Sequence, residues 1–127
     1  MTERERRRGE RHIACVPVQA RLDDAREFTG MICELSVVGA QILTQRRREV
    51  GEELELSIFL IDGEHPTKEV EARVVRCEQR HDGGIWSYLT VVEFKQQLVG
   101  LEAEIKAVAD AQELMLGPRS DRHRVAR

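Results

Sequence analysis

Aromatic side chains are scarce in this chain of 127 residues, which has one Trp, one Tyr and three Phe. Proteins that bind single-stranded nucleic acid commonly stack bases on several aromatic rings, and this sequence offers few. The net charge of −3 at pH 7 gives no overall attraction to nucleic acid or to an anionic membrane. The composition therefore disfavours a nucleic-acid-binding protein, and we expect no nucleic-acid partner.

Cysteine and long apolar runs are also in short supply. The three cysteines, Cys15, Cys33 and Cys77, are odd in number and widely spaced, which is not the pattern of a disulfide framework. No apolar run approaches the 18 residues of a membrane-spanning helix, and the charged N-terminus lacks the apolar core of a signal peptide. We therefore expect a cytoplasmic protein that does not insert into a membrane.

The common motifs of enzymes are missing as well. The sequence contains no GxGxxG, GxxxxGK[ST], GxSxG or HExxH pattern. His12 and Cys15 are three apart on an expected strand and so face opposite ways. Cys77 and His81 flank an expected turn, but two ligands are too few for a metal site. We therefore expect no catalytic residue, no metal and no cofactor.

Basic residues, by contrast, are plentiful and nearly all are arginine, which accounts for 17 of the 20. Five Arg lie within residues 4–11, three form residues 46–48 and four lie within residues 119–127. The planar guanidinium of Arg suits two-pronged contacts to phosphate and stacking on flat rings. These stretches are either solvated surface or contacts to an anionic ligand or partner.

The length allows one domain with one core. Apolar and polar residues alternate in six short segments, which is typical of strands. The segments are residues 12–22, 28–35, 39–45, 53–61, 69–79 and 85–94. Pro17 favours an edge position for the first of them. Since no helical pattern interrupts the series, residues 12–95 are predicted to form a six-stranded antiparallel β-barrel, an all-β fold.

The apolar period then lengthens to three and four residues over 96–116, which predicts an amphipathic C-terminal helix ended by Gly117. This helix either packs on the barrel or pairs with a second subunit, so both a monomer and a homodimer remain open. Residues 1–11 and 117–127 are too polar to pack, and we expect a flexible Arg-rich arm and a disordered tail.

Two short motifs stand out against this layout. Residues 7–11 (RRGER) match the pattern RxxxR just before the first strand, and residues 34–39 (ELSVVG) contain SxxG between the second and third strands. With the barrel and the C-terminal helix, these motifs resemble the PilZ domain family over about residues 4–115. PilZ domains are bacterial receptors for the second messenger cyclic di-GMP, and their pattern is RxxxR followed by [D/N]xSxxG.

The resemblance implies which residues would bind cyclic di-GMP. Arg7 and Arg11 would be the main contacts, with Arg8 as an added stacking or phosphate partner. Ser36 would reach phosphate or guanine through its hydroxyl, and Gly39 would allow close approach of the backbone. Arginine suits this ligand because its guanidinium matches both phosphate oxygens and the O6/N7 edge of guanine.

The sequence departs from the family pattern at two positions. Glu34 stands where the family has Asp or Asn, and its extra methylene moves the carboxylate by about a bond length. Glu34 would either still reach the guanine or pair with Arg7 or Arg11 and hold the site shut. Val91 stands where many members have Gly, before the Val-x-Phe that ends the last strand, and would narrow the ligand face.

These observations predict a non-enzymatic effector that binds cyclic di-GMP and signals to a protein partner. The family resemblance implies an output in motility, polarity or exopolysaccharide production. The first alternative is an adaptor that has lost the nucleotide and acts through its helix or through residues 46–48. The second is a small nucleic-acid-binding barrel that uses its Arg-rich ends.

Overall fold

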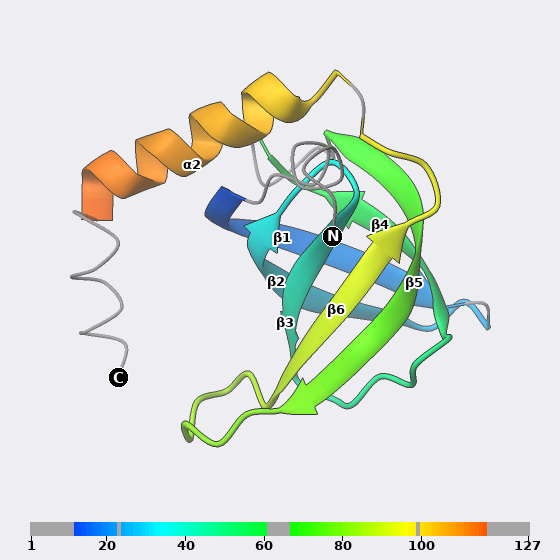
Figure 1. Ribbon diagram of the computed structural model, residues 1–127. Helices are drawn as coiled ribbons and strands as arrows, with labels where there is room; N and C mark the ends of the chain where they lie inside the picture. Colours follow the sequence, from blue (N-terminus) through cyan, green and yellow to red (C-terminus); the bar gives the residue numbers. More distant parts are fainter. Residues whose placement is uncertain (1–11, 23, 61–66, 99, 117–127) are drawn as a thin grey trace, which may run out of the picture.

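The computed structural model describes residues 12–22, 24–60, 67–98 and 100–116. Six antiparallel strands close into a barrel in the order β1-β2-β3-β6-β5-β4, and one helix, α2, follows them (Figure 1). The fold class predicted from the sequence, an all-β barrel of six antiparallel strands with a C-terminal helix, is confirmed. The expected arm and tail, residues 1–11 and 117–127, lie outside the described residues.

Most predicted strands agree with the observed ones to within a residue. The observed bounds are β1 His12–Leu22, β2 Glu27–Leu35, β3 Gly39–Thr44, β4 Glu53–Ile58, β5 Lys68–Gln79 and β6 Tyr88–Phe94. The predictions for β4 and β6 were too long. Beyond β4, the Thr67 N–H bonds back to the Ile58 carbonyl, so the chain turns there. Before β6, the Arg80 N–H bonds the Ser87 carbonyl and closes a loop.

Alternation of apolar residues places one row of side chains from each strand inside the barrel. In β1 the inward row runs from Ala14 to Leu22, with Val16 and Ala20 fully buried. Ile32, Ile42 and Leu56 from three other strands are buried to the same degree. Each such aliphatic side chain contributes roughly 1.5–3 kcal/mol when it leaves water, so this interior fixes the register of the strands.

Pro17 does not lie on an edge strand, because β1 pairs with β2 on one side and with β4 on the other. The expectation of an edge was wrong, but its physical reason still applies. The Pro17 carbonyl accepts from the Phe59 N–H at 3.1 Å, one residue beyond the last β1–β4 pair, Val18 with Ile58. In another residue the amide hydrogen would point to this same side. The pairing of β1 with β4 has already ended there, so the missing hydrogen of Pro17 removes no hydrogen bond between these strands.

The helix α2 spans Glu102–Leu116 and begins six residues later than predicted. Gly100 has φ of +93°, a left-handed conformation that interrupts any helix passing through it. Before it, Leu98 is already buried in the core and its N–H bonds the Val37 carbonyl at 2.8 Å. The described residues within 96–101, which were predicted to be helical, therefore form a non-helical segment at the end of the barrel. The helix starts only after this segment.

The helix α2 packs against the barrel at β1 (Figure 1). Ile105 and Ala109 are buried on its inner face. The side-chain amide of Gln112 accepts from the Cys15 N–H at 2.7 Å and donates to the Cys15 carbonyl at 2.8 Å. These two bonds satisfy backbone groups at the irregularity in β1 between residues 13 and 16. Nowhere in the described residues is a helix long and apolar enough to cross a membrane.

Candidate functional site

Ser36 organises the tight turn between β2 and β3. Its hydroxyl oxygen accepts from the N–H groups of Val38 and Gly39, both at 3.2 Å, and lies 3.3 Å from the Gly39 carbonyl. The Ser36 N–H also bonds that carbonyl at 3.0 Å, and the residue is only 5% exposed. The hydroxyl is thus engaged inside the turn, so its first effect is to fix the turn's shape.

Gly39 lies in close contact with the backbone of β6. A Cβ atom at this position would lie 2.4 Å from the Val92 carbonyl oxygen, a separation that no real side chain adopts. Two further contacts hold the turn against β6. Gly39 pairs with Glu93, and the Phe94 N–H bonds the Val38 carbonyl at 2.9 Å. The absence of a side chain therefore lets the turn lie flat against β6.

The start of β1 lies beside this turn. His12 pairs with Leu35, and Ile13 pairs with Glu34. Facing residues of antiparallel strands are about 5 Å apart. Arg7, Arg8 and Arg11 lie outside the described residues, but the residue that follows Arg11 directly is His12. The fold thus places the residue that follows the first motif next to the beginning of the second.

Glu34 is half-buried and lines a cavity of about 210 Å³ that also includes Ser36 and Gly39. The pairing of β2 with β3 is irregular between Ile32 and Glu34. Such irregularities commonly re-aim side chains next to functional sites. The structure therefore places all three described residues of the predicted site, Glu34, Ser36 and Gly39, around one cavity.

The cavity also has an apolar wall, of which the sequence predicted Val91 and not Val75. It includes Val75 and Val91, which lie on the outside of the barrel while Val74 and Val92 are buried inside. The pairing of β5 with β6 is irregular at Val75. A signal was present in the sequence, since two adjacent apolar residues on a strand must put one of them on the outer face.

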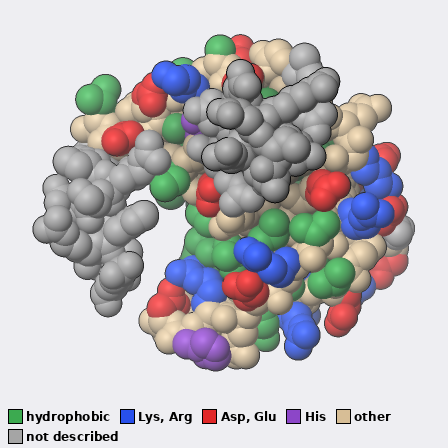
Figure 2. Space-filling model, in the orientation of Figure 1, with side chains coloured by type: hydrophobic (Ala, Val, Ile, Leu, Met, Phe, Trp, Pro, Cys, Tyr) green, Lys and Arg blue, Asp and Glu red, His purple; other side chains and the backbone are tan. Residues whose placement is uncertain are grey.

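Figure 2 shows hydrophobic side chains gathered on the barrel face formed by β3, β5 and β6, with charged groups around them. The side chain of Val75, on this face, is 38% exposed. Val91 occupies the position where many PilZ domains have Gly, and its side chain does line the cavity as the sequence suggested. An outer barrel face of this kind suits a flat, partly apolar ligand such as a purine base.

Cys33 is the described thiol closest to the site in sequence. Burial raises the pKa of the Cys33 thiol to about 11, and the neighbouring Glu34 carboxylate adds to the effect. Its S–H donates to the Gln41 carbonyl at 3.5 Å. The group therefore remains a neutral thiol at pH 7 and is not an activated nucleophile.

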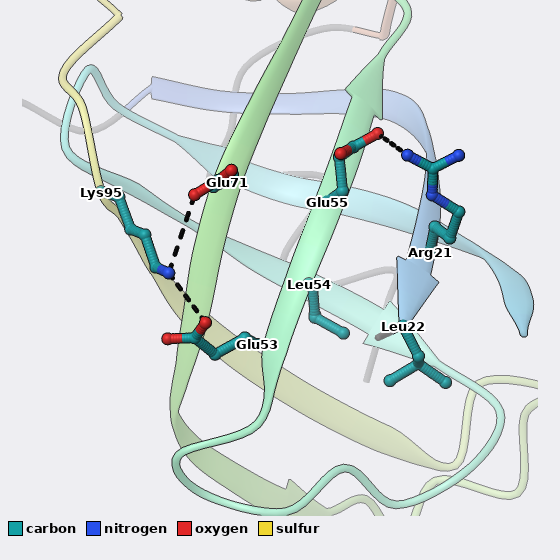
Figure 3. A pocket seen from close by; sticks show the side chains of 7 residues that line it. All are labelled: Arg21, Leu22, Glu53, Leu54, Glu55, Glu71 and Lys95. Carbon is teal, nitrogen blue, oxygen red and sulfur yellow. Dashed lines mark hydrogen bonds and ion pairs between the residues drawn. The ribbon is translucent and has the colours of Figure 1, made fainter. Parts of the chain in front are cut away.

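A second cavity, of about 250 Å³, lies on the outer face of β4 and β5 (Figure 3). Its charged groups are paired with one another: Lys95 lies 2.8 Å from Glu53 and 3.7 Å from Glu71, and Arg21 pairs with Glu55. The hydrogen bond from Lys95 lowers the pKa of Glu53, and the same bond raises the pKa of Lys95. Exposed pairs of this kind contribute little to stability. The lining holds three carboxylates and two cations, so it carries one net negative charge and does not attract an anionic ligand.

Within the described part of the chain, no group of three or more His, Cys, Asp or Glu residues is arranged to hold a metal ion. The four candidate features are thus a turn shaped by Ser36, a close contact at Gly39, the carboxylate of Glu34 and an apolar wall from Val75 and Val91. Together they line one surface beside the start of β1.

Comparison with known proteins agrees with this architecture. The family model described as PilZ domain matches residues 5–110. No curated protein matches the chain. Among solved structures, the PilZ domain with c-di-GMP of YcgR from Escherichia coli is similar with a TM-score of 0.63 and 17% identity, over 87% of this chain and 93% of that one.

Two further structures show the same fold. The inhibitor of motility MotI/DgrA from Bacillus subtilis has a TM-score of 0.61 and 22% identity over 84% of this chain, which spans 50% of the Bacillus protein. The PilZ domain of CeSA from a cellulose-synthesizing bacterium has a TM-score of 0.51 and 18% identity, over 82% of this chain and 98% of that one. With the family model matching most of its length, this chain belongs to the PilZ domain family.

Proposed function

We propose that this chain is a receptor for cyclic di-GMP, which it binds between the arm residues Arg7 to Arg11 and the turn Glu34 to Gly39. The observation that carries the proposal is the pairing of His12 with Leu35, which brings the chain just after Arg11 to the start of that turn. Similar structures that contain c-di-GMP, such as the PilZ domain of YcgR, support the choice of ligand.

Each part of the site has a distinct task in this proposal. The guanidinium groups of Arg7, Arg8 and Arg11 bind phosphate oxygens and guanine edges. The apolar wall of Val75 and Val91 receives a flat ring on the outside of the barrel. The cavity of about 210 Å³ is smaller than the roughly 300–1,000 Å³ of typical ligand sites, so the arm must supply the rest of the enclosure.

The decisive experiment is calorimetric titration of the protein with cyclic di-GMP at physiological salt, with GTP as the control. We expect saturable binding in the micromolar range or tighter for the cyclic dinucleotide and none for GTP, because two phosphates and two guanines engage several arginines at once. The absence of heat and of a thermal shift with cyclic di-GMP would contradict the receptor proposal.

The alternative is an adaptor that has lost the nucleotide, and the structure contains features that favour it. Glu34 replaces the shorter Asp or Asn, Val91 fills space on the ligand face, and the Ser36 hydroxyl is engaged within its turn. Under this alternative the same barrel acts only through contacts with another protein. The two functions are separated by the titration above and by the substitution that follows.

Shortening the carboxylate at position 34 tests the contribution of this departure. We expect Glu34→Asp to bind cyclic di-GMP about tenfold more tightly than the natural chain, because a relaxed charged hydrogen bond is worth about 1.5–3 kcal/mol. Calorimetry of both proteins measures the difference. The matched control is Glu93→Asp, which shortens another carboxylate lining the same cavity and is expected to leave the affinity unchanged.

Three outcomes of this substitution have different meanings. If the natural chain binds cyclic di-GMP measurably and Glu34→Asp binds it more tightly, the receptor proposal is supported. Binding by Glu34→Asp alone supports the adaptor, since Glu34 then closes the site. Weaker binding by Glu34→Asp shows that the longer carboxylate already makes the contact, and the expectation for this residue is then wrong.

The output of the domain is also a proposal. A receptor without catalytic chemistry acts through another molecule, and we propose a protein partner in the cytoplasm. One similar structure is that of an inhibitor of motility from Bacillus subtilis, which makes motility the first process in which to look for an effect. A deletion strain assayed for swimming, with and without the Glu34→Asp variant, examines this directly.

A further inference from the structure

A further cavity bounded by described residues lies away from the proposed nucleotide site. It has a volume of about 650 Å³ and opens between the start of β2, the β3–β4 loop and the β5–β6 loop. Here it is named the basic groove, and its lining includes Leu22, Arg26, Phe28, Arg46, Arg48 and Trp86. Glu27 is the one carboxylate among the residues that line it.

The basic groove and the proposed nucleotide site occupy opposite ends of the barrel. Strand β2 connects them, with Phe28 near its beginning and Leu35 at its end. Seven residues of strand span about 23 Å. In Figure 1 the β5–β6 loop that contributes Trp86 lies at the foot of the barrel, far from α2. A ligand in one site therefore does not fill the other.

Part of the lining of the basic groove is an arginine that lies over an aromatic ring. The guanidinium of Arg48 lies 4.7 Å from the centre of the Phe28 ring, and its side chain is only 14% exposed. It also lies 3.7 Å from Glu52 and donates through Nε to the Arg47 carbonyl at 3.1 Å. Half-buried Trp86 forms another part of the lining. Preformed Arg and Trp side chains of this kind are the residues that dominate protein interfaces.

The rim of the basic groove has unused positive charge. Arg46 is exposed and forms no ion pair with any described residue. Arg26 is 71% exposed, and its one described carboxylate partner is Asp24 at 2.7 Å. Glu27 accepts a hydrogen bond from Gln19 at 2.8 Å. Arg26 and Arg48 are thus paired with Asp24 and Glu52, and Arg46 is the exposed cation of the groove that is left to meet an anionic occupant.

Exposed apolar side chains extend the surface beyond the groove. Val50 in the β3–β4 loop is 68% exposed, and Ile85 in the β5–β6 loop is 72% exposed. Both loops also contribute residues to the groove itself, Arg46 and Trp86 among them. A small anion would leave these side chains in water, whereas a protein segment would cover them. The occupant must therefore combine negative charge with apolar side chains over several residues.

We propose that the basic groove is the docking surface for an acidic segment of a partner protein, with an apolar side chain that inserts beside Trp86. This inference rests on the proposed function in one respect. It takes the protein partner proposed there and assigns the basic groove as the surface that binds it. Carboxylates of the segment pair with Arg46 and Arg26, and its apolar side chains cover the two exposed loops. Arg46 and Arg48, two members of an arginine run that the nucleotide site does not use, thereby acquire a role.

The chain carries its own reporter for this test, because Trp86 is its one tryptophan. The probe is a synthetic eight-residue peptide in which Asp and Glu surround a Leu-Phe pair, added to the full chain at low salt. We expect a saturable change in tryptophan fluorescence with this peptide and none with its Asn/Gln counterpart. Added salt weakens the binding, since surface ion pairs are screened.

Two neighbouring arginines provide matched variants. Arg46→Ala is expected to weaken the peptide at least about fivefold, since it removes an exposed charge-assisted contact. Arg47→Ala removes the same charge one residue away, at a side chain that does not line the groove, and is expected to change the affinity by less than about twofold. Calorimetry with cyclic di-GMP on both variants should match the natural chain, which separates failure of this site from failure of the nucleotide site.

Three results would overturn the proposal. One is the absence of a saturable fluorescence change at about 1 mM peptide, a concentration that detects even very weak binding. Another is an equal loss of affinity in Arg46→Ala and Arg47→Ala, which indicates diffuse attraction without a site. The last is a fluorescence change that follows protein concentration without peptide, which makes a second copy of this chain the occupant.

Discussion

Replacing Arg7 or Arg11 by Ala is expected to weaken cyclic di-GMP binding by about 100-fold or more. Each replacement removes charge-assisted hydrogen bonds to phosphate or guanine, which are worth about 1.5–3 kcal/mol apiece, and an arginine makes more than one. The two residues form the RxxxR motif and precede His12, which pairs with Leu35 at the site. Calorimetric titration of both variants measures the loss.

The same variants should melt at nearly the temperature of the natural chain when no ligand is present. A binding residue contributes to stability through the ligand, whereas a structural residue contributes without it. Arg6→Ala is the matched control, because it removes the same charge from the arm outside the RxxxR pair. If Arg7→Ala or Arg11→Ala lowers the melting temperature of the free protein strongly, these arginines are structural and their assignment as ligand contacts is wrong.

The barrel was predictable from the sequence because burial imposes a period of two on every strand. Strand β1 shows this best: its predicted and observed bounds coincide, and Val16, Val18, Ala20 and Leu22 face inward as expected. A shift of one residue would expose this entire row to water. The closed order of the strands follows from the same constraint, since six half-apolar strands have to surround one core.

Features that depend on contacts between distant residues were less predictable. The left-handed Gly100 delays α2, although the apolar period over residues 96–101 is that of a helix. Pro17 is tolerated between two partner strands because β4 ends beside it. Neither the end of a neighbouring strand nor the φ angle of a glycine is encoded in local hydrophobicity, so pattern alone could not place them.

The candidate site shows the same division. The motif identified Glu34, Ser36 and Gly39 by residue type, and the structure gathers them around one cavity. It did not identify Val75, whose outward position arises from an irregular β5–β6 pairing. Nor could it show that Ser36 bonds within its own turn. The contacts of a side chain in this turn depend on the neighbouring strand β6. That strand is far away in the sequence and comes next to the turn only in the folded barrel.

Replacing Gly39 by Ala is expected to destabilise the fold by about 3 kcal/mol, at the upper end for an overpacked site. The added Cβ would lie 2.4 Å from the Val92 carbonyl oxygen, so backbone must move. It cannot move freely, because Gly39 pairs with Glu93 and the next residues of β3 continue the same ladder. Thermal unfolding should show a melting temperature lower by roughly 10 °C for a domain of this size.

A second glycine controls for the general effect of adding a methyl group. At Gly84 a Cβ would lie no closer than 3.4 Å to a neighbouring atom, the Asp82 carboxylate in the exposed β5–β6 loop. Gly84→Ala should therefore leave the melting temperature within about 2 °C of the natural value, or raise it slightly by restricting the unfolded chain. Equal melting temperatures for the two variants would show that the turn can shift away from β6. Gly39 would then be required by the ligand and not by the barrel, and cyclic di-GMP affinity of Gly39→Ala would fall while its stability did not.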